Sequence, residues 1–346
     1  MGVYTQLNLD VIHSIPTFQP RLMIDWLIDG YGRVAAVGTS QLASYVEIVY
    51  IINNANITAE LLNEILELKN IKKYFLVKKN FREMFHLTER QYIKAVDDVS
   101  FIIGKGRVFV LAGGSGSGKT TLARLILRAI EPDSGSIIFN GEDITKNTDN
   151  KLRKFRTNVQ MIHQDPFTSL NPRMKIIDIV MEPLNIHNKQ NSKCERREKV
   201  LRSLENVRLE PVVDIAEKFP HMLSGGQRQR VALARSLVLK PKLVIADEPV
   251  SNLDVSVRAE ILDLMKNLKD KFQISFLYIT HDLSTSRYIG DEIAIMHEGK
   301  IVEMGQIDQV LLNPFHPYTQ ALIDAIPDPD PDNLQREKIS ISGEEK

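Results

Sequence analysis

One glycine-rich run limits what this chain can fold into more than any other feature. The residues from Gly113 to Thr120 read Gly-Gly-Ser-Gly-Ser-Gly-Lys-Thr, which fits the pattern G-x-x-x-x-G-K-[ST] in full. Glycines let the backbone fold tightly, so several N–H groups converge on one anion, and a helix beginning near Lys119 would point its positive end at that anion. An apolar, strand-like run precedes the glycines, and residues 121–127 continue with helical spacing. The pattern therefore predicts a phosphate-binding loop, and the alternative is a Gly/Ser linker that happens to contain a lysine.

The individual positions of this loop suggest different roles. Lys119 would reach the β- and γ-phosphates of a nucleotide, Thr120 would offer its hydroxyl to Mg²⁺, and Thr121 would lie near the α-phosphate. The other loop residues expected to contact the phosphates are Gly113, Ser115, Gly116 and Gly118.

A pair of acidic residues follows a second strand-like run, residues 243–246. Asp247, at the end of that run, is placed to hold the Mg²⁺ shell, usually through water. Glu248 can point at the γ-phosphate and is the candidate for polarising the attacking water. Positioning is the main contribution of such a base, because phosphoryl transfer leaves little covalent chemistry to the protein. The alternative for an acidic pair after a strand is a helix cap or a turn.

Residues 223–227 read Leu-Ser-Gly-Gly-Gln and lie between these two motifs. By itself this run could be an ordinary loop, but in this order with the other motifs it resembles the signature of ATP-binding-cassette (ABC) ATPases. The resemblance implies that the signature contacts the γ-phosphate of an ATP molecule held by an opposite subunit, and a Ser-Gly-Gly turn opening a helix suits an anion. The residues that it assigns to this contact are Ser224, Gly225, Gly226 and Gln227.

The same resemblance assigns roles to further residues. Gln164 occupies the position of the lid glutamine, which would touch Mg²⁺ and the attacking water, although an exposed loop amide is the alternative. His281 would hold the γ-phosphate, and its alternative is a polar cap at a strand end. Asp254 belongs to a run that resembles the loop crossing the dimer axis, with Asn252 where the family usually has alanine. An adenine-stacking aromatic is expected upstream; Tyr74 and Phe75 are the candidates, Phe75 is favoured, and a core aromatic is the alternative.

The resemblance also implies the fold class and the domain organisation. It implies an α/β fold, an ABC-type P-loop ATPase with a RecA-like core, an antiparallel β subdomain and a helical signature subdomain. We expect an ATPase domain over residues 65–326, with the helical subdomain at about residues 175–239, and a Pro/Asp-rich tail over residues 327–346. Residues 1–64 match nothing in the family and could be a packed extension, a regulatory segment or upstream sequence attached by a misplaced start.

Several stretches are similar to the dipeptide/oligopeptide importer branch of the family. They include residues 163–174, where His163 replaces the usual phenylalanine, and residues 313–319. Val250-Ser251 resembles the second of the two paired ATPases of these systems. Many members continue into a cysteine-bearing extension that in some binds an iron–sulfur cluster, whereas this chain has one cysteine, Cys194. One thiol cannot hold a cluster, so no metal beyond Mg²⁺ is predicted.

Composition excludes some classes of function. The formal net charge is +0, which argues against binding nucleic acid through its phosphates. No run reaches the roughly 18 uncharged apolar residues that span a bilayer, and the first 30 residues lack a signal peptide's basic start and apolar core. One cysteine allows no internal disulfide and suits a reducing compartment. Membrane contact would therefore come through other chains, at the cytoplasmic face.

The sequence thus predicts the ATP-hydrolysing subunit of a dipeptide/oligopeptide-type ABC importer. The partners that the resemblance implies are two transmembrane permease subunits, a second ABC ATPase and, indirectly, an extracellular solute-binding protein. The second ATPase could be a sister subunit or another copy of this chain, and the cargo could be a peptide or an oligosaccharide. One alternative is a soluble ABC ATPase with a mechanical role in translation or DNA repair. Another is a regulatory cassette that binds ATP without turnover, against which Asp247, Glu248, Gln164 and His281 argue.

Overall fold

The computed structural model describes residues 64–76, 92–165, 169–187 and 192–325. Contacts divide the chain into two units, residues 1–62 and 63–346, and every described residue belongs to the second unit. The expected N-terminal extension, apart from Glu64, and the expected tail lie outside the described residues.

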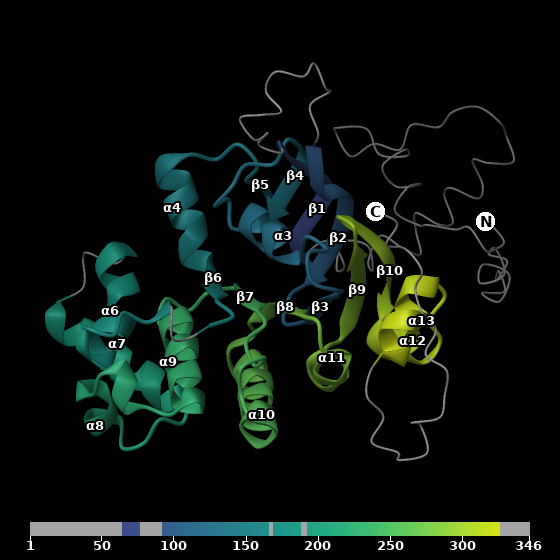
Figure 1. The fold of residues 1–346 in the computed structure, drawn as a ribbon. Helices are drawn as coiled ribbons and strands as arrows, with labels where there is room; N and C mark the ends of the chain where they lie inside the picture. The colour runs from purple at the N-terminus through teal and green to yellow at the C-terminus, as the bar shows by residue number, and fades with distance from the viewer. Residues whose placement is uncertain (1–63, 77–91, 166–168, 188–191, 326–346) are drawn as a thin grey trace, which may run out of the picture. The chain divides into compact units, whose positions relative to one another are not determined.

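A 6-stranded sheet in the order β10-β9-β3-β8-β7-β6 forms the centre of the described unit (Figure 1). Neighbouring strands from β9 to β6 are parallel, and only the edge strand β10 is antiparallel to its neighbour. Every residue of β3, β7 and β8 is buried, as expected for parallel strands covered on both faces. The strands are β3 (Val108–Ala112), β6 (Val159–Ile162), β7 (Leu243–Asp247), β8 (Ser275–Thr280), β9 (Glu292–His297) and β10 (Lys300–Gln306).

A second, 4-stranded sheet in the order β2-β1-β4-β5 is antiparallel throughout. Its buried face packs with the central sheet in one apolar cluster, in which the rings of Phe101 and Phe109 stack at 4.6 Å between centroids. This sheet is the antiparallel subdomain expected from the sequence. Its strands are β1 (Glu64–Leu76), β2 (Tyr92–Gly104), β4 (Ser134–Phe139) and β5 (Glu142–Asp143).

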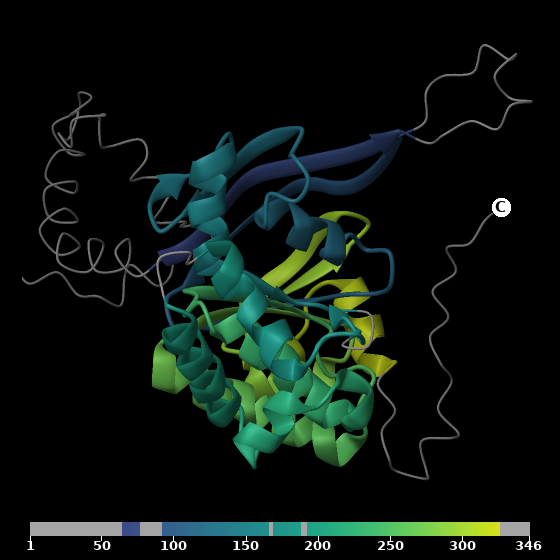
Figure 2. The same ribbon diagram turned by 90° about the vertical axis from the view of Figure 1, so that its left-hand side faces the viewer.

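The helical subdomain groups α6 (Ile176–His187), α7 (Lys193–Asn206), α8 (Val212–Glu217) and α9 (Gly225–Leu237), shown in teal and green at the left of Figure 1. Figure 2, turned by 90°, shows the same helices facing the viewer below the antiparallel sheet. Buried apolar residues of these helices continue into the same cluster as strands β3, β7 and β8. The helical subdomain is therefore packed onto the central sheet rather than separated from it.

Six further helices of the described part of the chain lie outside the helical subdomain. They are α3 (Lys119–Ile126), α4 (Asp149–Asn158), α10 (Val255–Phe272), α11 (Leu283–Ile289), α12 (Ile307–Leu312) and α13 (Pro317–Asp324). Helix α10 buries one apolar side, formed by Ile261, Leu262, Leu264, Met265 and Leu268. Among the described residues, no helix combines the length and the apolar character that crossing a membrane requires.

Candidate nucleotide site

The phosphate loop connects the buried strand β3 to the start of α3 at Lys119, as the sequence predicts. Two of its glycines cannot be replaced without a clash. A Cβ atom at Gly113, where φ is +152°, would lie 2.1 Å from the carbonyl oxygen of Met296. A Cβ atom at Gly118, where φ is +107°, would lie 2.1 Å from the carbonyl oxygen of Ala95. The backbones of two neighbouring segments therefore lie so close to the loop that a side chain does not fit at either glycine.

Lys119 is almost completely buried and points back into the loop. Its Nζ atom donates to the carbonyl oxygens of Gly113 at 2.8 Å and Gly114 at 2.7 Å. Burial lowers the pKa of this ammonium group, and the carboxylates of Glu248 and Asp247 oppose that effect. The lysine is thus a desolvated cation that the loop holds at the place where phosphates are expected.

Asp247 is the last residue of β7 and leaves only 6% of its surface exposed. Burial raises the pKa of its carboxyl, and the hydroxyl of Thr120, which donates a hydrogen bond to it, opposes this shift. A carboxylate and a hydroxyl are hard oxygen donors of the kind that Mg²⁺ prefers, and a desolvated carboxylate gains from a nearby cation. The structure therefore brings together Thr120 and Asp247, two residues for which the sequence predicts a role in binding Mg²⁺.

Glu248 lies at the centre of a hydrogen-bonded group of three side chains. Its Oε2 atom accepts from Nε2 of Gln164 at 2.7 Å, and its Oε1 atom lies 2.8 Å from Nδ1 of His281. The backbone of Glu248 is in the left-handed region at φ 47°, and its N–H donates to the carbonyl of Ile279 at 2.9 Å. These three residues follow the parallel strands β6, β7 and β8, so the carboxyl ends of neighbouring strands bring them together.

One residue of this region has no counterpart among the predicted site residues. Arg258 of α10 donates to Oδ2 of Asp282 at 3.2 Å and to the carbonyl oxygen of Leu253 at 3.2 Å. Asp282 in turn caps α11 by accepting from the N–H of Ser284 at 3.0 Å. Arg258 therefore joins the segment before α10 to the segment that carries His281. The position of Arg258 in the sequence does not mark it as a site residue, because an arginine in the first turn of a helix is common.

The signature residues open a helix, as predicted. Ser224 caps α9 through a capping box, in which its Oγ accepts from the N–H of Gln227 at 3.2 Å while its own N–H donates to Oε1 of Gln227 at 3.1 Å. The side chain of Ser224 is exposed, and a Cβ atom at Gly226 would lie 2.5 Å from a methyl group of Val257. Asp254, also exposed, precedes α10. The signature therefore presents an open helix N-terminus held close to α10.

The two candidate stacking aromatics differ in their surroundings. Tyr74 is half-buried, and its hydroxyl donates to Oδ1 of Asp97 at 2.5 Å. The ring of Phe75 is 41% exposed near the end of β1, with Nζ of Lys73 at 5.8 Å from its centroid. Of the two rings, Phe75 is the more accessible to a nucleotide.

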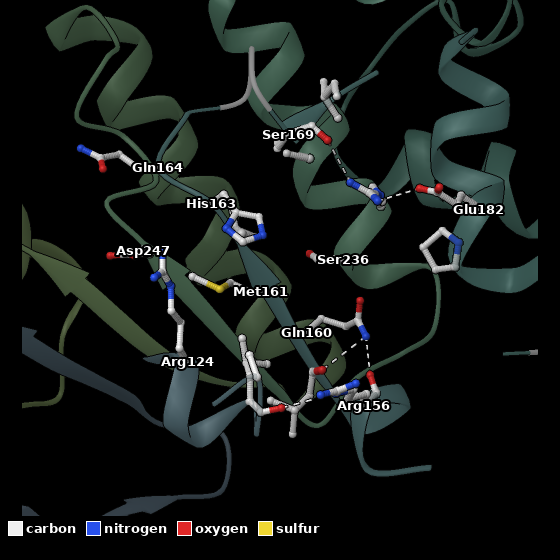
Figure 3. Close-up of a pocket in the computed structure, with 18 of the residues that line it drawn as sticks. Arg124, Arg156, Gln160, Met161, His163, Gln164, Ser169, Glu182, Ser236 and Asp247 are labelled. Atoms are coloured by element: carbon white, nitrogen blue, oxygen red, sulfur yellow. Dashed lines mark hydrogen bonds and ion pairs between the residues drawn. The ribbon is translucent and has the colours of Figure 1, made fainter. Parts of the chain in front are cut away.

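A cleft of about 970 Å³, lined by Thr120 and Asp247 at one end, extends toward the helical subdomain. Figure 3 shows His163 and Gln164 near Asp247, and Glu182 at the far side. There Arg235 of α9 donates to Oε2 of Glu182 at 2.7 Å. Residues 163–165, which follow β6, thus line the same cleft as Asp247 and the helices of the signature subdomain.

The fold and this site define a class of protein: a P-loop ATPase of the ABC type. The family model described as ABC transporter matches residues 96–251, and the model described as Oligopeptide/dipeptide transporter, C-terminal region, matches residues 302–345. The fold is similar to a dimeric ATP-binding cassette in a post-hydrolysis state bound to ADP and Pi, at a TM-score of 0.60 and 28% identity, covering 70% of this chain and 99% of that chain. It is also similar to cbiO1 from Clostridium perfringens, at a TM-score of 0.61 and 26% identity, over 72% of this chain and 92% of the other.

Curated relatives narrow the class to a family. The chain is 44% identical over 284 residues to the oligopeptide transport ATP-binding protein AppF of Bacillus subtilis, covering 81% of this chain and 84% of the relative. It is 47% identical over 271 residues to OppF of Streptococcus mutans, covering 78% and 87%. It is 44% identical over 286 residues to the dipeptide transport ATP-binding protein DppF of Escherichia coli, covering 83% of each. The chain therefore belongs to the ATP-binding subunits of the oligopeptide/dipeptide ABC transporters, which are ATPases.

Proposed function

We propose that Glu248 positions the water that attacks the γ-phosphate of ATP in this chain, and that Gln164 and His281 orient it. The observation that carries this proposal is the hydrogen-bonded group in which Glu248 accepts from Gln164 at 2.7 Å and contacts His281 at 2.8 Å. A carboxylate whose two oxygens both have partners is held in one orientation, which is what water positioning requires. Lys119 and the loop backbone would hold the phosphates, with the ring of Phe75 against the adenine.

Thr120 and Asp247 are the residues that would hold Mg²⁺, with Gln164 completing its shell. When bound, the ion would neutralise charge on the β- and γ-phosphates. Asp247 supports this proposal because burial raises the pKa of its carboxyl, so a cation bound beside it would stabilise the ionised form. Lys119 would exchange its bonds to the carbonyl oxygens of the loop for bonds to the phosphates.

The exposed signature supports a second proposal, that a partner ATPase completes each nucleotide site. Ser224 is exposed and the first residues of α9 are partly exposed, and a helix N-terminus of this kind suits an anion. ATP bound to the phosphate loop of one subunit would be contacted by the signature of the other, with Asp254 near the dimer axis. Closure would be driven by ATP, because ATP contacts both halves only when they are together. A sister subunit is favoured as the partner, and two copies of this chain remain the second possibility.

The named functions of the relatives support the transport role. AppF, OppF and DppF are named as oligopeptide or dipeptide transport ATP-binding proteins. We propose that this chain powers the import of peptides, with an oligosaccharide as the other possible cargo, as a peripheral subunit at the cytoplasmic face of the membrane. Two permease subunits would receive the motion through the loop from Gln164, which lines the cleft, and a solute-binding protein would deliver the cargo. Residues 65–326 would form the ATPase domain of this assembly.

Purification of the tagged chain from gently solubilised native membranes tests this assignment. Two multi-span permeases and a second, different ATPase are the expected partners, and an attached solute-binding protein would identify the cargo. Phosphate release by the recovered complex, measured with and without Mg²⁺, tests the enzyme directly. Recovery with ribosomes or DNA-repair proteins and no membrane protein would contradict the transport role.

A further inference from the structure

A tyrosine far along the chain contacts the phosphate loop. The hydroxyl oxygen of Tyr318, in α13, accepts a hydrogen bond from the backbone N–H of Gly114 at 2.9 Å, across a separation of 204 residues. The ring of Tyr318 stacks on that of His297, with 3.9 Å between centroids and 25° between planes. His297 is the last residue of β9, the strand beside β3, so the ring rests on the same sheet that carries the loop.

The start of α13 is itself fixed to the sheet. The carboxylate of Glu303, in β10, accepts from the N–H of Phe315 at 2.8 Å and from the N–H of His316 at 3.0 Å. Nδ1 of His316 accepts from the N–H of Tyr318 at 3.1 Å and so caps the helix. The position of Tyr318 is therefore determined by backbone bonds on one side and by a ring contact on the other.

The bond from Gly114 acts on one particular peptide unit. The N–H of Gly114 and the carbonyl oxygen of Gly113 belong to the same planar group and point in opposite directions. That carbonyl oxygen accepts from Nζ of Lys119 at 2.8 Å, so the peptide is held from both sides. If Lys119 turns to the phosphates, the bond to Tyr318 is the one that still restrains this plane. A Gly-Gly peptide without such a restraint has more rotational freedom than any other pair of residues.

We propose that Tyr318 is a positioning residue for the phosphate loop. It holds the peptide between Gly113 and Gly114 in the orientation that the nucleotide requires, and so lowers the entropy that ATP binding must remove. The residue lies within the region 302–345 that matches the oligopeptide/dipeptide C-terminal model, outside the region 96–251 that matches the general ABC model. The C-terminal region of this chain thereby acts on nucleotide affinity and leaves the chemical step to Glu248.

The variant Tyr318→Phe tests the inference, because it removes the hydroxyl and keeps the ring on His297. The matched control is Tyr288→Phe, which removes a tyrosine hydroxyl bonded to Asp263 on the surface of α11 and α10. ATP affinity of the full chain is measured by displacement of a fluorescent ATP analogue. KM and kcat are measured on the assembled complex, and the melting temperature without nucleotide is measured for all three proteins.

Loss of one hydrogen bond to the loop is expected to weaken ATP affinity about three- to tenfold in Tyr318→Phe. KM should rise by a similar factor, while kcat at saturating ATP stays within about twofold of wild type. ATP affinity equal to wild type in Tyr318→Phe would overturn the inference, as would an equal loss in Tyr288→Phe or a loss that merely follows a lower melting temperature. The inference rests on the proposed nucleotide site, and the two fail separately: a wild-type chain that binds no ATP would overturn the site itself.

Discussion

Nδ1 of His281 lies 2.8 Å from Oε1 of Glu248, although the two residues are 33 positions apart and follow different strands. Because Gln164 occupies the other carboxylate oxygen, both oxygens of Glu248 have partners from the protein itself. His281 is the more exposed of the two residues, with 56% of its side-chain surface accessible to solvent against 16% for Glu248. The side chain of His281 is therefore less enclosed by the protein than that of Glu248.

Replacing Glu248 with glutamine should abolish turnover while preserving ATP binding. Glutamine keeps the shape but cannot accept a proton or carry the negative charge that orients the water, so phosphate release by the assembled complex should fall about 100- to 10,000-fold. The closed, ATP-bound form should accumulate. A matched control is Glu198→Gln, which changes a surface glutamate paired with Arg202 on α7. Phosphate release by Glu248→Gln no lower than that of wild type would show that another residue positions the water.

Replacing Ser224 with arginine should disable the partner's nucleotide site more than the site of its own chain. The bulky cation would occupy the exposed helix N-terminus where a phosphate is proposed to bind. The variant also loses a helix cap, at a cost of about 1 kcal/mol. Ser192→Arg is the control, because Ser192 caps α7 through an equivalent capping box with Glu195 and belongs to no predicted site. Nucleotide trapping resolved by site provides the measurement, and preferential loss at the variant's own site would contradict the in-trans contact.

Replacing Asp247 with asparagine should stabilise the nucleotide-free chain while removing its Mg²⁺-dependent activity. Burial holds the pKa of this carboxyl above its usual range, so the ionised form is a cost to the folded state. The expected gain at neutral pH is about 1 kcal/mol in the free energy of unfolding, on the scale typical of a single substitution.

The same substitution has a predicted pH dependence. Between the usual carboxyl pKa and the raised pKa of Asp247, the folded chain binds more protons than the unfolded chain, so wild-type stability falls as the pH rises through that window. The gain in the free energy of unfolding of Asp247→Asn over wild type should therefore be complete above the raised pKa. It should disappear when the pH falls to the usual carboxyl pKa. Denaturant titrations of both proteins at several pH values measure this difference in the free energy of unfolding. A difference that grows on acidification would contradict a raised pKa for Asp247.

Replacing Phe75 with alanine should weaken the binding of ATP and GTP alike. Ring stacking on a base contributes about 0.5–1.5 kcal/mol and is tolerant of base identity, so the expected loss is about two- to tenfold for each nucleotide. Tyr74→Phe serves as the control, because it removes only the hydroxyl that donates a hydrogen bond to Asp97 and keeps the ring. A further variant, Tyr74→Ala, removes the other candidate ring. Nucleotide titrations that show a loss of affinity in Tyr74→Ala and none in Phe75→Ala would assign the stacking role to Tyr74.

Much of the site was predictable because its parts are contiguous in the sequence. The loop from Gly113 to Thr120 lies between β3 and α3 as predicted, and Asp247 ends β7. The signature begins α9 with Ser224 as its cap. In each case a few neighbouring residues determine the local conformation, because glycine conformational freedom, helix capping and strand burial act over short distances.

The contacts among distant residues were less predictable. The sequence predicts Glu248 and His281 at the γ-phosphate and Gln164 at Mg²⁺ and the attacking water. The hydrogen bonds among the three side chains follow from the strand order β6-β7-β8. Nothing in the spacing of Arg258 or Tyr318 marks either residue as a neighbour of the site. Arg258 reaches Asp282 only because α10 packs beside α11.

The sequence by itself determined the local motifs of this protein: a glycine-rich loop between a strand and a helix, two carboxylates after a strand, and a signature run that opens a helix. Each of these is a local pattern, because interactions among a few neighbouring residues determine its conformation. The tertiary structure alone decided how the parts are held, including the bond from Gly114 to Tyr318 across 204 residues. Such a bond depends on the packing of α13 against β9 and β10, and packing is a property of the folded sheet that no short run of residues encodes.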